Sequence, residues 1–496
     1  MARTTRTATS RLLWALCVTV LAWPHAAAGY DIVNRWSATQ WDGSGLERGD
    51  PVTLRWSIVP DGQSYSRSDN SHLIDFLDDG WGVPIRRRSP DLTSRAWWSV
   101  MDAAYAQYGR VSGITMVYVP EQNADGGDSG MVGDIRIGGE VIDDQPGGVL
   151  ADNTFPNHGD MRIDTSRETD GGVPYWFREE APLRNLVIHE SGHGVGLGHT
   201  TPTGAKAVME SGLRTDIWGL QFDDVYALNR QYGDPLEKER GNDTSRTATV
   251  LGDFTTTGSV SIGTAATDSV VDQLDDDWVG IDGSNDNDWF RFSITGKTFA
   301  DITLTPVGPS YSTAEQGAFN AAALNDLVLQ FYSTSPALHL EATASRYGIG
   351  LAESIGARFL PAAGDYLVRV LGLEDVNQFY QLDLVLNELP LPGTSADLNL
   401  DGATDSDDWA IFVTHSSLNL SGYSALDAFQ LGDLDHDGDN DDDDTQFFAT
   451  AFDAVNGAGA FAHLMQVPEP TTLWMLVLAG LCVRMAPQSR RDQRSR

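Results

Sequence analysis

Hydrophobic and polar residues follow different periods in different parts of this chain, and each period predicts a type of element. Three stretches have the pattern of helices: 94–108, 183–193 and 223–230. Four shorter segments are typical of strands: 53–58, 115–119, 134–137 and 161–164. We therefore expect residues 30–235 to form an α+β domain that contains three helices.

Between residues 249 and 388 the strand period of two dominates. The alternating segments are 288–294, 300–304, 327–332, 366–370 and 380–386. Short strands with glycine-rich turns predict a β-sandwich, and the charged, polar residues 236–248 before it predict a linker. The Asp-x-Asp-Trp-Phe run at Asp286 and the Gly364-Asp365-Tyr366 strand entry resemble the pre-peptidase C-terminal domain of secreted bacterial proteases. An unrelated accessory sandwich is the alternative.

The N-terminus carries a short apolar stretch after several arginines. Arg3, Arg6 and Arg11 come first, an apolar run covers 12–23, and three alanines follow at 26–28. This order predicts a secretory signal peptide over residues 1–28, because a transmembrane anchor needs a longer run. The two cysteines, Cys17 and Cys482, lie in the N-terminal and C-terminal apolar stretches, so the exported body is expected to contain no disulfide.

The C-terminus combines Pro-Glu-Pro at 468–470, an apolar stretch over 473–483 and an arginine-rich end. This order resembles the PEP-CTERM sorting tail of Gram-negative bacteria, here over residues 467–496. The resemblance implies recognition by a sorting enzyme at the membrane. The protein would then be exported, extracellular or on the cell surface, and transiently membrane-anchored. An ordinary C-terminal anchor is the alternative.

Acidic residues outnumber basic ones by 70 to 33, and the net charge is −37. Such a surface disfavours nucleic acid and anionic lipid as partners. Many of the acids lie in two loops within residues 397–452, where oxygen-bearing residues alternate and a glycine occupies position six, as in calcium loops. The predicted Ca²⁺ ligands are Asp397, Asn399, Asp401, the Ala403 carbonyl, Asp405 and Asp408, and then Asp433, Asp435, Asp437, Asp439, Asp441 and Asp444.

Apolar residues follow each acidic loop and predict a helix there, which would make a small α calcium-loop pair. Both loops end in aspartate where the EF-hand pattern has glutamate. The duplicated unit resembles a dockerin, which implies two bound Ca²⁺ ions and a cohesin-like partner. Two alternatives remain: a plain acidic linker, or a repeat that only stiffens the chain when calcium binds.

Residues 189–199 read His-Glu-x-x-His-x-x-Gly-x-x-His. Helical residues four apart face nearly the same way, so His189 and His193 can offer two imidazoles to one metal, with Glu190 beside them. The glycines after His193 end the helix, and Gly196 can adopt a positive φ that turns the chain back. His199 would then be a third ligand. Three protein ligands leave one position open for water or substrate, as a catalytic zinc requires.

Met209 follows the third histidine by ten residues, and with the histidine motif it resembles the metzincins, and within them the matrixins. Residues 147–156 are similar to the loop that wraps the matrixin catalytic domain, and residues 221–233 to its closing helix. The resemblance covers residues 36–234. It implies a mixed sheet, one Zn²⁺ on the three histidines, Glu190 as general base, and Met209 as support beneath the metal.

Two features depart from the matrixin pattern or add to it. Matrixins often hold a second, structural zinc with histidines near the wrapping loop, but between residues 134 and 164 this sequence has only His158. Asp143 and Asp144 are candidates for one further Ca²⁺, or are simply loop acids.

The sequence as a whole predicts an exported zinc metalloendopeptidase that acts on protein or peptide substrates through a zinc-activated water. The alternative is a calcium-dependent surface adhesion or scaffold protein whose protease domain is minor or silent.

Overall fold

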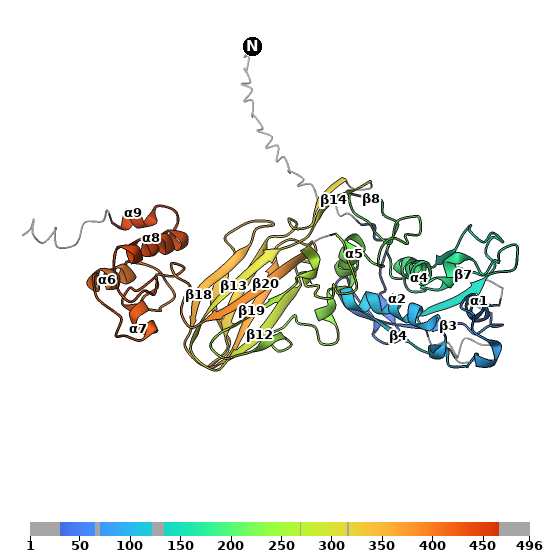
Figure 1. Cartoon of the computed structure of the whole chain (residues 1–496), viewed down its shortest axis with the longest axis horizontal. Helices are drawn as coiled ribbons and strands as arrows, with labels where there is room; N and C mark the ends of the chain where they lie inside the picture. The colour runs from blue at the N-terminus through green and yellow to red at the C-terminus, as the bar shows by residue number, and fades with distance from the viewer. Residues whose placement is uncertain (1–29, 65–69, 122–132, 268, 315–316, 466–496) are drawn as a thin grey trace, which may run out of the picture.

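The computed structural model describes residues 30–64, 70–121, 133–267, 269–314 and 317–465. Three parts follow one another along the long axis of the molecule: the N-terminal domain (30–235), the sandwich (249–388) and the C-terminal repeat (397–452) (Figure 1). The predicted signal peptide and sorting tail lie outside the described residues. Of the helices in the described ranges, none is both long and apolar enough to cross a bilayer.

The N-terminal domain contains a five-stranded sheet with the order β4-β3-β5-β7-β6. Its strands are β3 (Val52–Ile58), β4 (Ile114–Tyr118), β5 (Ile135–Glu140), β6 (Ala151–Asn153) and β7 (Met161–Asp164). Only β6, at one edge, is antiparallel to its neighbour. The mixed sheet implied by the resemblance is therefore present, and the four predicted strands match β3, β4, β5 and β7. A small hairpin of β1 (Ala38–Thr39) and β2 (Gly43–Ser44) precedes the sheet.

The three predicted helices are present as α2 (Trp98–Val111), α4 (Glu180–Gly194) and α5 (Phe222–Tyr232). The expectation of only three helices is wrong, because α1 (Leu73–Gly80) and α3 (Tyr175–Arg178) also form. Helix α1 is amphipathic and buries Leu73, Phe76 and Leu77 at helical spacing. Its eight residues end in Asp-Asp-Gly, so the apolar pattern is too short to distinguish it from a loop.

The sandwich consists of two five-stranded sheets, in which all five predicted strands are present. One sheet has the order β17-β16-β19-β12-β9: β17 (His339–Ala344), β16 (Leu327–Ser333), β19 (Gly364–Gly372), β12 (Asn287–Ile294) and β9 (Thr249–Phe254). The other runs β10-β20-β13-β18, with β11 beside β20: β10 (Gly258–Ile262), β20 (Gln378–Asn387), β13 (Thr298–Pro306), β18 (Glu353–Leu360) and β11 (Gly280–Ile281). Alternate side chains of each strand, such as Phe290, Phe292, Ile302 and Leu304, fill the space between the sheets.

The N-terminal domain and the sandwich share one hydrophobic core. Every residue of α5 is buried, which requires cover on all sides of this helix. The sandwich supplies part of that cover: Phe379 lies 5.7 Å from Phe222, and Phe319 lies 5.3 Å from Tyr226, between ring centroids. A sandwich hairpin, β14 (Ser310–Thr313) and β15 (Gly317–Asn320), also pairs with β8 (Pro202–Thr203) of the N-terminal domain (Figure 1).

Two residues of 236–248, the predicted linker, are buried where the N-terminal domain meets the sandwich. Asn242 is fully buried, and its carbonyl oxygen accepts a hydrogen bond from the backbone N–H of Trp289. Glu237 is also buried, but most other polar residues of the segment are exposed: Glu239, Arg240, Asp243, Thr244 and Arg246.

The C-terminal repeat has a helix after each acidic loop, as predicted. These helices are α6 (Ser406–Thr414) and α8 (Asp442–Asn456). Helix α7 (Ala425–Gln430) lies between them in the chain, and α9 (Ala460–Leu464) follows the repeat. Its core includes Phe412 and Phe448, and reaches the sandwich through Phe299, whose ring centroid lies 6.0 Å from that of Phe429.

Candidate metal centre

Helix α4 and the turn after it bring the three histidines together. His189 and His193 lie one helical turn apart, and the helix ends at Gly194. Gly196 then adopts a φ of 101°, and a Cβ at this position would lie only 1.8 Å from the Asn34 carbonyl oxygen. The predicted glycine turn is therefore present, and it returns the chain so that His199 faces the helix.

The Nε2 atoms of the histidines converge at the spacing that zinc requires. His199 Nε2 lies 3.2 Å from His193 Nε2 and 3.3 Å from His189 Nε2. Ligand nitrogens at a Zn–N distance of about 2.0–2.1 Å in a tetrahedron are about 3.3–3.4 Å apart. The Nδ1 atoms of the two helical histidines also have partners: His189 Nδ1 lies 2.8 Å from the Val208 carbonyl oxygen, and His193 Nδ1 lies 2.8 Å from that of Leu197. Such carbonyl contacts hold a metal-binding imidazole in one orientation and tautomer.

The surroundings favour the neutral, metal-binding form of these imidazoles. Burial lowers the pKa of His189 to about 4, and it also lowers the pKa of His193. At neutral pH both rings are therefore unprotonated, as metal ligation requires.

Glu190 and the histidines line one cleft with a volume of about 790 Å³. Burial, with a smaller contribution from the Asp152 carboxylate, raises the pKa of Glu190 to about 8. A dication beside this carboxyl group would favour its ionised form and lower the pKa again. Asn153 on β6 donates a 2.6 Å hydrogen bond to the Glu190 carbonyl oxygen, which ties the helix to the wall of the cleft.

Met209 packs against α4, the helix that carries His189 and His193. A Cβ at Gly192 would lie only 2.3 Å from the Met209 sulfur, so this glycine allows the close approach. Asp224 holds the turn from the other side, because its carboxylate accepts hydrogen bonds from the backbone N–H groups of Val208 (2.8 Å) and Met209 (3.2 Å). The same carboxylate takes part in the capping box of α5.

The remaining candidates in the N-terminal domain lie apart from this centre. His158 is exposed, and among the described residues it does not join any group of three metal-binding side chains. Asp143 accepts hydrogen bonds from the backbone N–H groups of Gln145 (3.0 Å) and Val149 (2.9 Å), so it folds its own loop. Asp144 has a positive φ of 56° in the same turn.

The second acidic loop of the C-terminal repeat brings carboxylates together. Oxygens of Asp433, Asp435 and Asp444 lie within 4.8 Å of one another, and so do those of Asp439, Asp441 and Asp444. In the first loop Asp408 accepts hydrogen bonds from the N–H groups of Leu398 (2.8 Å) and Asn399 (3.2 Å). Asp397 accepts one from Gly402 (2.9 Å).

A further acidic cluster, which the sequence analysis missed, lies at the junction of the N-terminal domain and the sandwich. Carboxylate oxygens of Glu237, Asp286 and Asp288 lie within 4.8 Å of one another, and all three residues are buried. Burial, with the neighbouring carboxylates next, raises the pKa of each. Asn242 Nδ2 donates a 2.8 Å hydrogen bond to Asp288.

Several oxygens of this junction cluster still lack a partner. Within the described part of the chain, Glu237 Oε1, Asp286 Oδ1 and Asn242 Oδ1 are buried without a hydrogen-bond donor. Buried carboxylates without a counter-charge are costly, and an oxygen-lined site suits a hard dication such as Ca²⁺. The ligands come from two segments about fifty residues apart, so spacing could not reveal them. The Asp-x-Asp run at Asp286 is a local signal of this cluster, but on its own it indicates only the type of fold.

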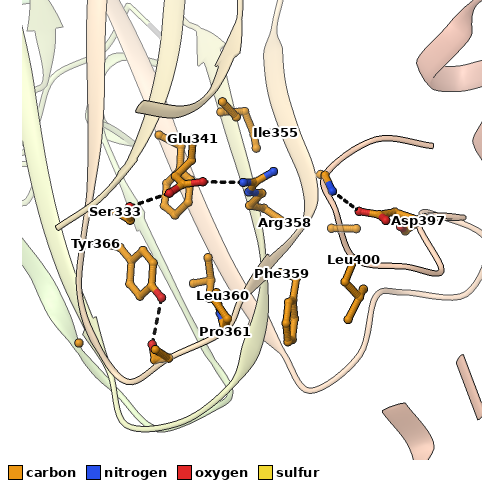
Figure 2. A pocket seen from close by; sticks show the side chains of 18 of the residues that line it. Ser333, Glu341, Ile355, Arg358, Phe359, Leu360, Pro361, Tyr366, Asp397 and Leu400 are labelled. Atoms are coloured by element: carbon orange, nitrogen blue, oxygen red, sulfur yellow. Dashed lines mark hydrogen bonds and ion pairs between the residues drawn. The ribbon is translucent and has the colours of Figure 1, made fainter. Parts of the chain in front are cut away.

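A separate cavity of about 480 Å³ lies between the sandwich and the C-terminal repeat. Figure 2 shows its polar side chains occupied with one another: Glu341 accepts a hydrogen bond from Ser333 (2.6 Å) and pairs with Arg358 (2.7 Å). The Tyr366 hydroxyl donates to the Ala362 carbonyl oxygen (2.9 Å). Glu341 and Arg358 therefore neutralise each other in this cavity, in contrast to the junction cluster.

One family model matches part of the N-terminal domain. The family model described as Matrixin matches residues 84–233, which include the three histidines, Glu190 and Met209. This match suggests a zinc metallopeptidase. No curated protein matches the chain.

Two solved structures are similar to part of the chain. One is the pre-peptidase C-terminal domain of a collagenase from Bacillus anthracis, with 13% identity over 28% of this chain and 94% of that one, and a TM-score of 0.16. The other is PliG from Aeromonas hydrophila, a periplasmic inhibitor of g-type lysozyme, with 10% identity over 28% of this chain and 99% of that one, and a TM-score of 0.16. Similarities this distant do not indicate an activity for this chain.

Proposed function

We propose that this chain is an exported zinc-dependent endopeptidase that hydrolyses peptide bonds of extracellular proteins. The observation that carries the proposal is the convergence of three histidine Nε2 atoms at 3.2 and 3.3 Å, in a cleft that Glu190 also lines. A carboxyl group beside an open three-histidine site is the arrangement that metal-assisted hydrolysis needs.

The side chains in the cleft have distinct roles in this reaction. Zinc on the three imidazoles would supply a Lewis acid for the scissile carbonyl and lower the pKa of a bound water. Glu190 accepts a proton from the attacking water and passes it to the leaving amine. Strand β6 is the edge of its sheet, and its residues line the cleft, so an extended substrate can add to this edge by backbone hydrogen bonds.

Substitution of Glu190 tests this function. Glu190→Ala is expected to retain zinc but to lose at least about 99% of its casein-cleaving rate, because general base catalysis contributes about 10²–10⁴-fold. Glu180→Ala is the matched control: it lies in the first turn of the same helix, and its side chain is 66% exposed. Equal cleavage by the zinc-loaded wild type and Glu190→Ala would falsify the assigned role.

Export and sorting are supported by the patterns at residues 1–28 and 467–496. In this proposal the protein reaches the cell surface or medium, and a membrane sorting enzyme acts on the tail. Fractionation of cells that express the full chain should find the protein outside the inner membrane. Retention in the cytoplasm would contradict export.

A calcium-dependent adhesion or scaffold role is the second candidate. The grouping of Asp433, Asp435 and Asp444 favours it, because three carboxylates at one point suit Ca²⁺. In that case the C-terminal repeat would bind two Ca²⁺ ions and a cohesin-like partner. A Glu190→Ala chain that keeps full calcium-dependent attachment to cells would favour this role, whereas cleavage of protein by the wild type favours the protease.

A further inference from the structure

Helix α5 connects the sandwich to the turn that supports the zinc site. On its inner side Asp224 holds the backbone N–H groups of Val208 and Met209. The carbonyl oxygen of the same Val208 contacts His189 Nδ1 at 2.8 Å. The peptide groups on either side of Val208 therefore join α5 to the first metal ligand.

The sandwich contacts α5 at Asp223, the residue next to Asp224. Tyr311 on β14 donates a hydrogen bond from its hydroxyl group to Asp223, and its ring is 8% exposed. The ring packs 6.2 Å from Phe222 and 5.1 Å from Phe319, between centroids. Tyr311 thus fixes the start of α5, where Asp224 begins its contacts with the methionine turn.

A second connection between the sandwich and the metal centre does not involve α5. It reaches the segment between His199 and Met209. Strand β8 pairs with β14, with Thr203 opposite Ser312 and Pro202 opposite Thr313. The Ala314 N–H donates a 3.0 Å hydrogen bond to the Thr201 carbonyl oxygen, two residues after the third histidine. The Thr200 N–H in turn donates to the Met209 carbonyl oxygen at 3.0 Å. Both ends of the segment from His199 to Met209 are therefore tied to neighbouring structure.

We propose that the sandwich hairpin β14–β15 positions the zinc site, with Tyr311 as the positioning residue, so that the N-terminal domain depends on the sandwich for full activity. The proposal rests on the proposed function for its kinetic consequence, but its effect on metal retention stands independently. Tyr311 touches neither metal nor substrate and acts through Asp223, α5 and the methionine turn.

Tyr311→Phe tests this role in the full chain, because it removes only the hydroxyl group and keeps the ring in the core. Tyr366→Phe is the matched control: it is a buried tyrosine of the same sandwich, and its hydroxyl donates to Ala362 at the end away from the zinc site. We expect Tyr311→Phe to release zinc to a chelator about three- to tenfold faster than wild type, somewhat less than the loss on removing a direct outer-shell partner. We also expect kcat to fall by a similar factor while KM stays unchanged.

Ala314→Pro is an independent test. It removes the N–H group that donates a hydrogen bond to the Thr201 carbonyl oxygen, and it leaves Tyr311 unchanged. Both variants are compared with Tyr366→Phe well below their unfolding temperatures. If Tyr311 and Ala314 contribute only to the stability of the fold, zinc release and kcat will be unchanged under these conditions. The proposal would be overturned if Tyr311→Phe and Ala314→Pro had the same zinc release and the same kcat as Tyr366→Phe. If the wild type cleaves no protein, the proposed function fails, but zinc release still decides whether the hairpin positions the metal ligands.

Discussion

At the scale of single residues, the zinc site depends on small side chains as much as on its ligands. Gly196 allows the turn that returns His199, and Gly192 allows Met209 to pack directly against α4. A side chain at either position would collide with a neighbour. A Cβ at Gly196 would lie 1.8 Å from the Asn34 carbonyl oxygen, and a Cβ at Gly192 would lie 2.3 Å from the Met209 sulfur. The motif specifies the glycine at Gly196, whereas Gly192 occupies one of its unspecified positions and is explained only by the contact with Met209.

Gly192→Ala is expected to force Met209 away from α4 and to destabilise the chain by about 1–3 kcal/mol, the usual cost of overpacking. Gly147→Ala is the control, because a Cβ there meets nothing within 4 Å. Urea unfolding of the two variants measures the difference. A Gly192→Ala chain as stable as Gly147→Ala would show that Met209 does not pack as described.

At the scale of elements, each acidic loop is built onto the helix that follows it. Asp444 closes the capping box of α8 with Asp441 and also belongs to both carboxylate groups of the second loop. Its position at the end of the loop would therefore serve both the helix and the proposed Ca²⁺ ion. Asp408 has the same relation to α6 and Asp405 in the first loop.

Asp444→Ala is expected to abolish Ca²⁺ binding in the second loop and to reduce the stoichiometry of the C-terminal repeat from two ions to one. Asp442→Ala is the control, because Asp442 is exposed in the first turn of the same helix and belongs to neither carboxylate group. Calorimetric titration of the full chain with and without each substitution counts the ions. An unchanged count in Asp444→Ala would contradict the assigned ligands.

The pattern of neighbouring residues in the sequence is sufficient to predict elements that are built from one continuous segment. Helix α4, its end at Gly194 and the approach of His199 all followed from eleven consecutive residues. The sequence did not reveal the cover over α5, because the sandwich residues that bury it, such as Tyr311 and Phe379, lie far along the chain. The junction cluster is hidden for the same reason, since Glu237 lies in the predicted linker and Asp286 in a run that resembles the pre-peptidase C-terminal domain.

At the scale of the whole molecule, the N-terminal domain and the sandwich form one packed body with acidic groups at their junction. Burial is the main cause that raises the pKa of Asp234 to about 8 and that of Asp282 to about 6. The Asp234 carboxylate accepts hydrogen bonds from the N–H groups of Leu236 (2.6 Å) and Gly280 (2.8 Å), and so spans the junction.

These shifts predict how stability depends on pH and on cations. An aspartate in the unfolded chain has a pKa of about 3.9, so these groups bind more protons when folded, and stability falls as the pH rises from about 4 to about 8. In chelator we expect the unfolding temperature to fall over this range, and Ca²⁺ to raise it again at pH 8.

Glu237→Gln separates an effect of Ca²⁺ at the junction from one at the acidic loops, because it removes one of the clustered carboxylates and leaves those loops intact. We expect this variant to lose part of the Ca²⁺-induced rise in unfolding temperature. A rise equal to that of the wild type would show that the cation acts elsewhere.

Zinc-edge X-ray absorption of the purified full chain tests the central claim most directly. The account predicts one zinc per chain with three histidine nitrogens at about 2.0–2.1 Å and one oxygen ligand completing the shell. His199→Ala should reduce the histidine count to two. A native chain that retains no zinc, or a shell with fewer than three histidines in the wild type, would contradict it.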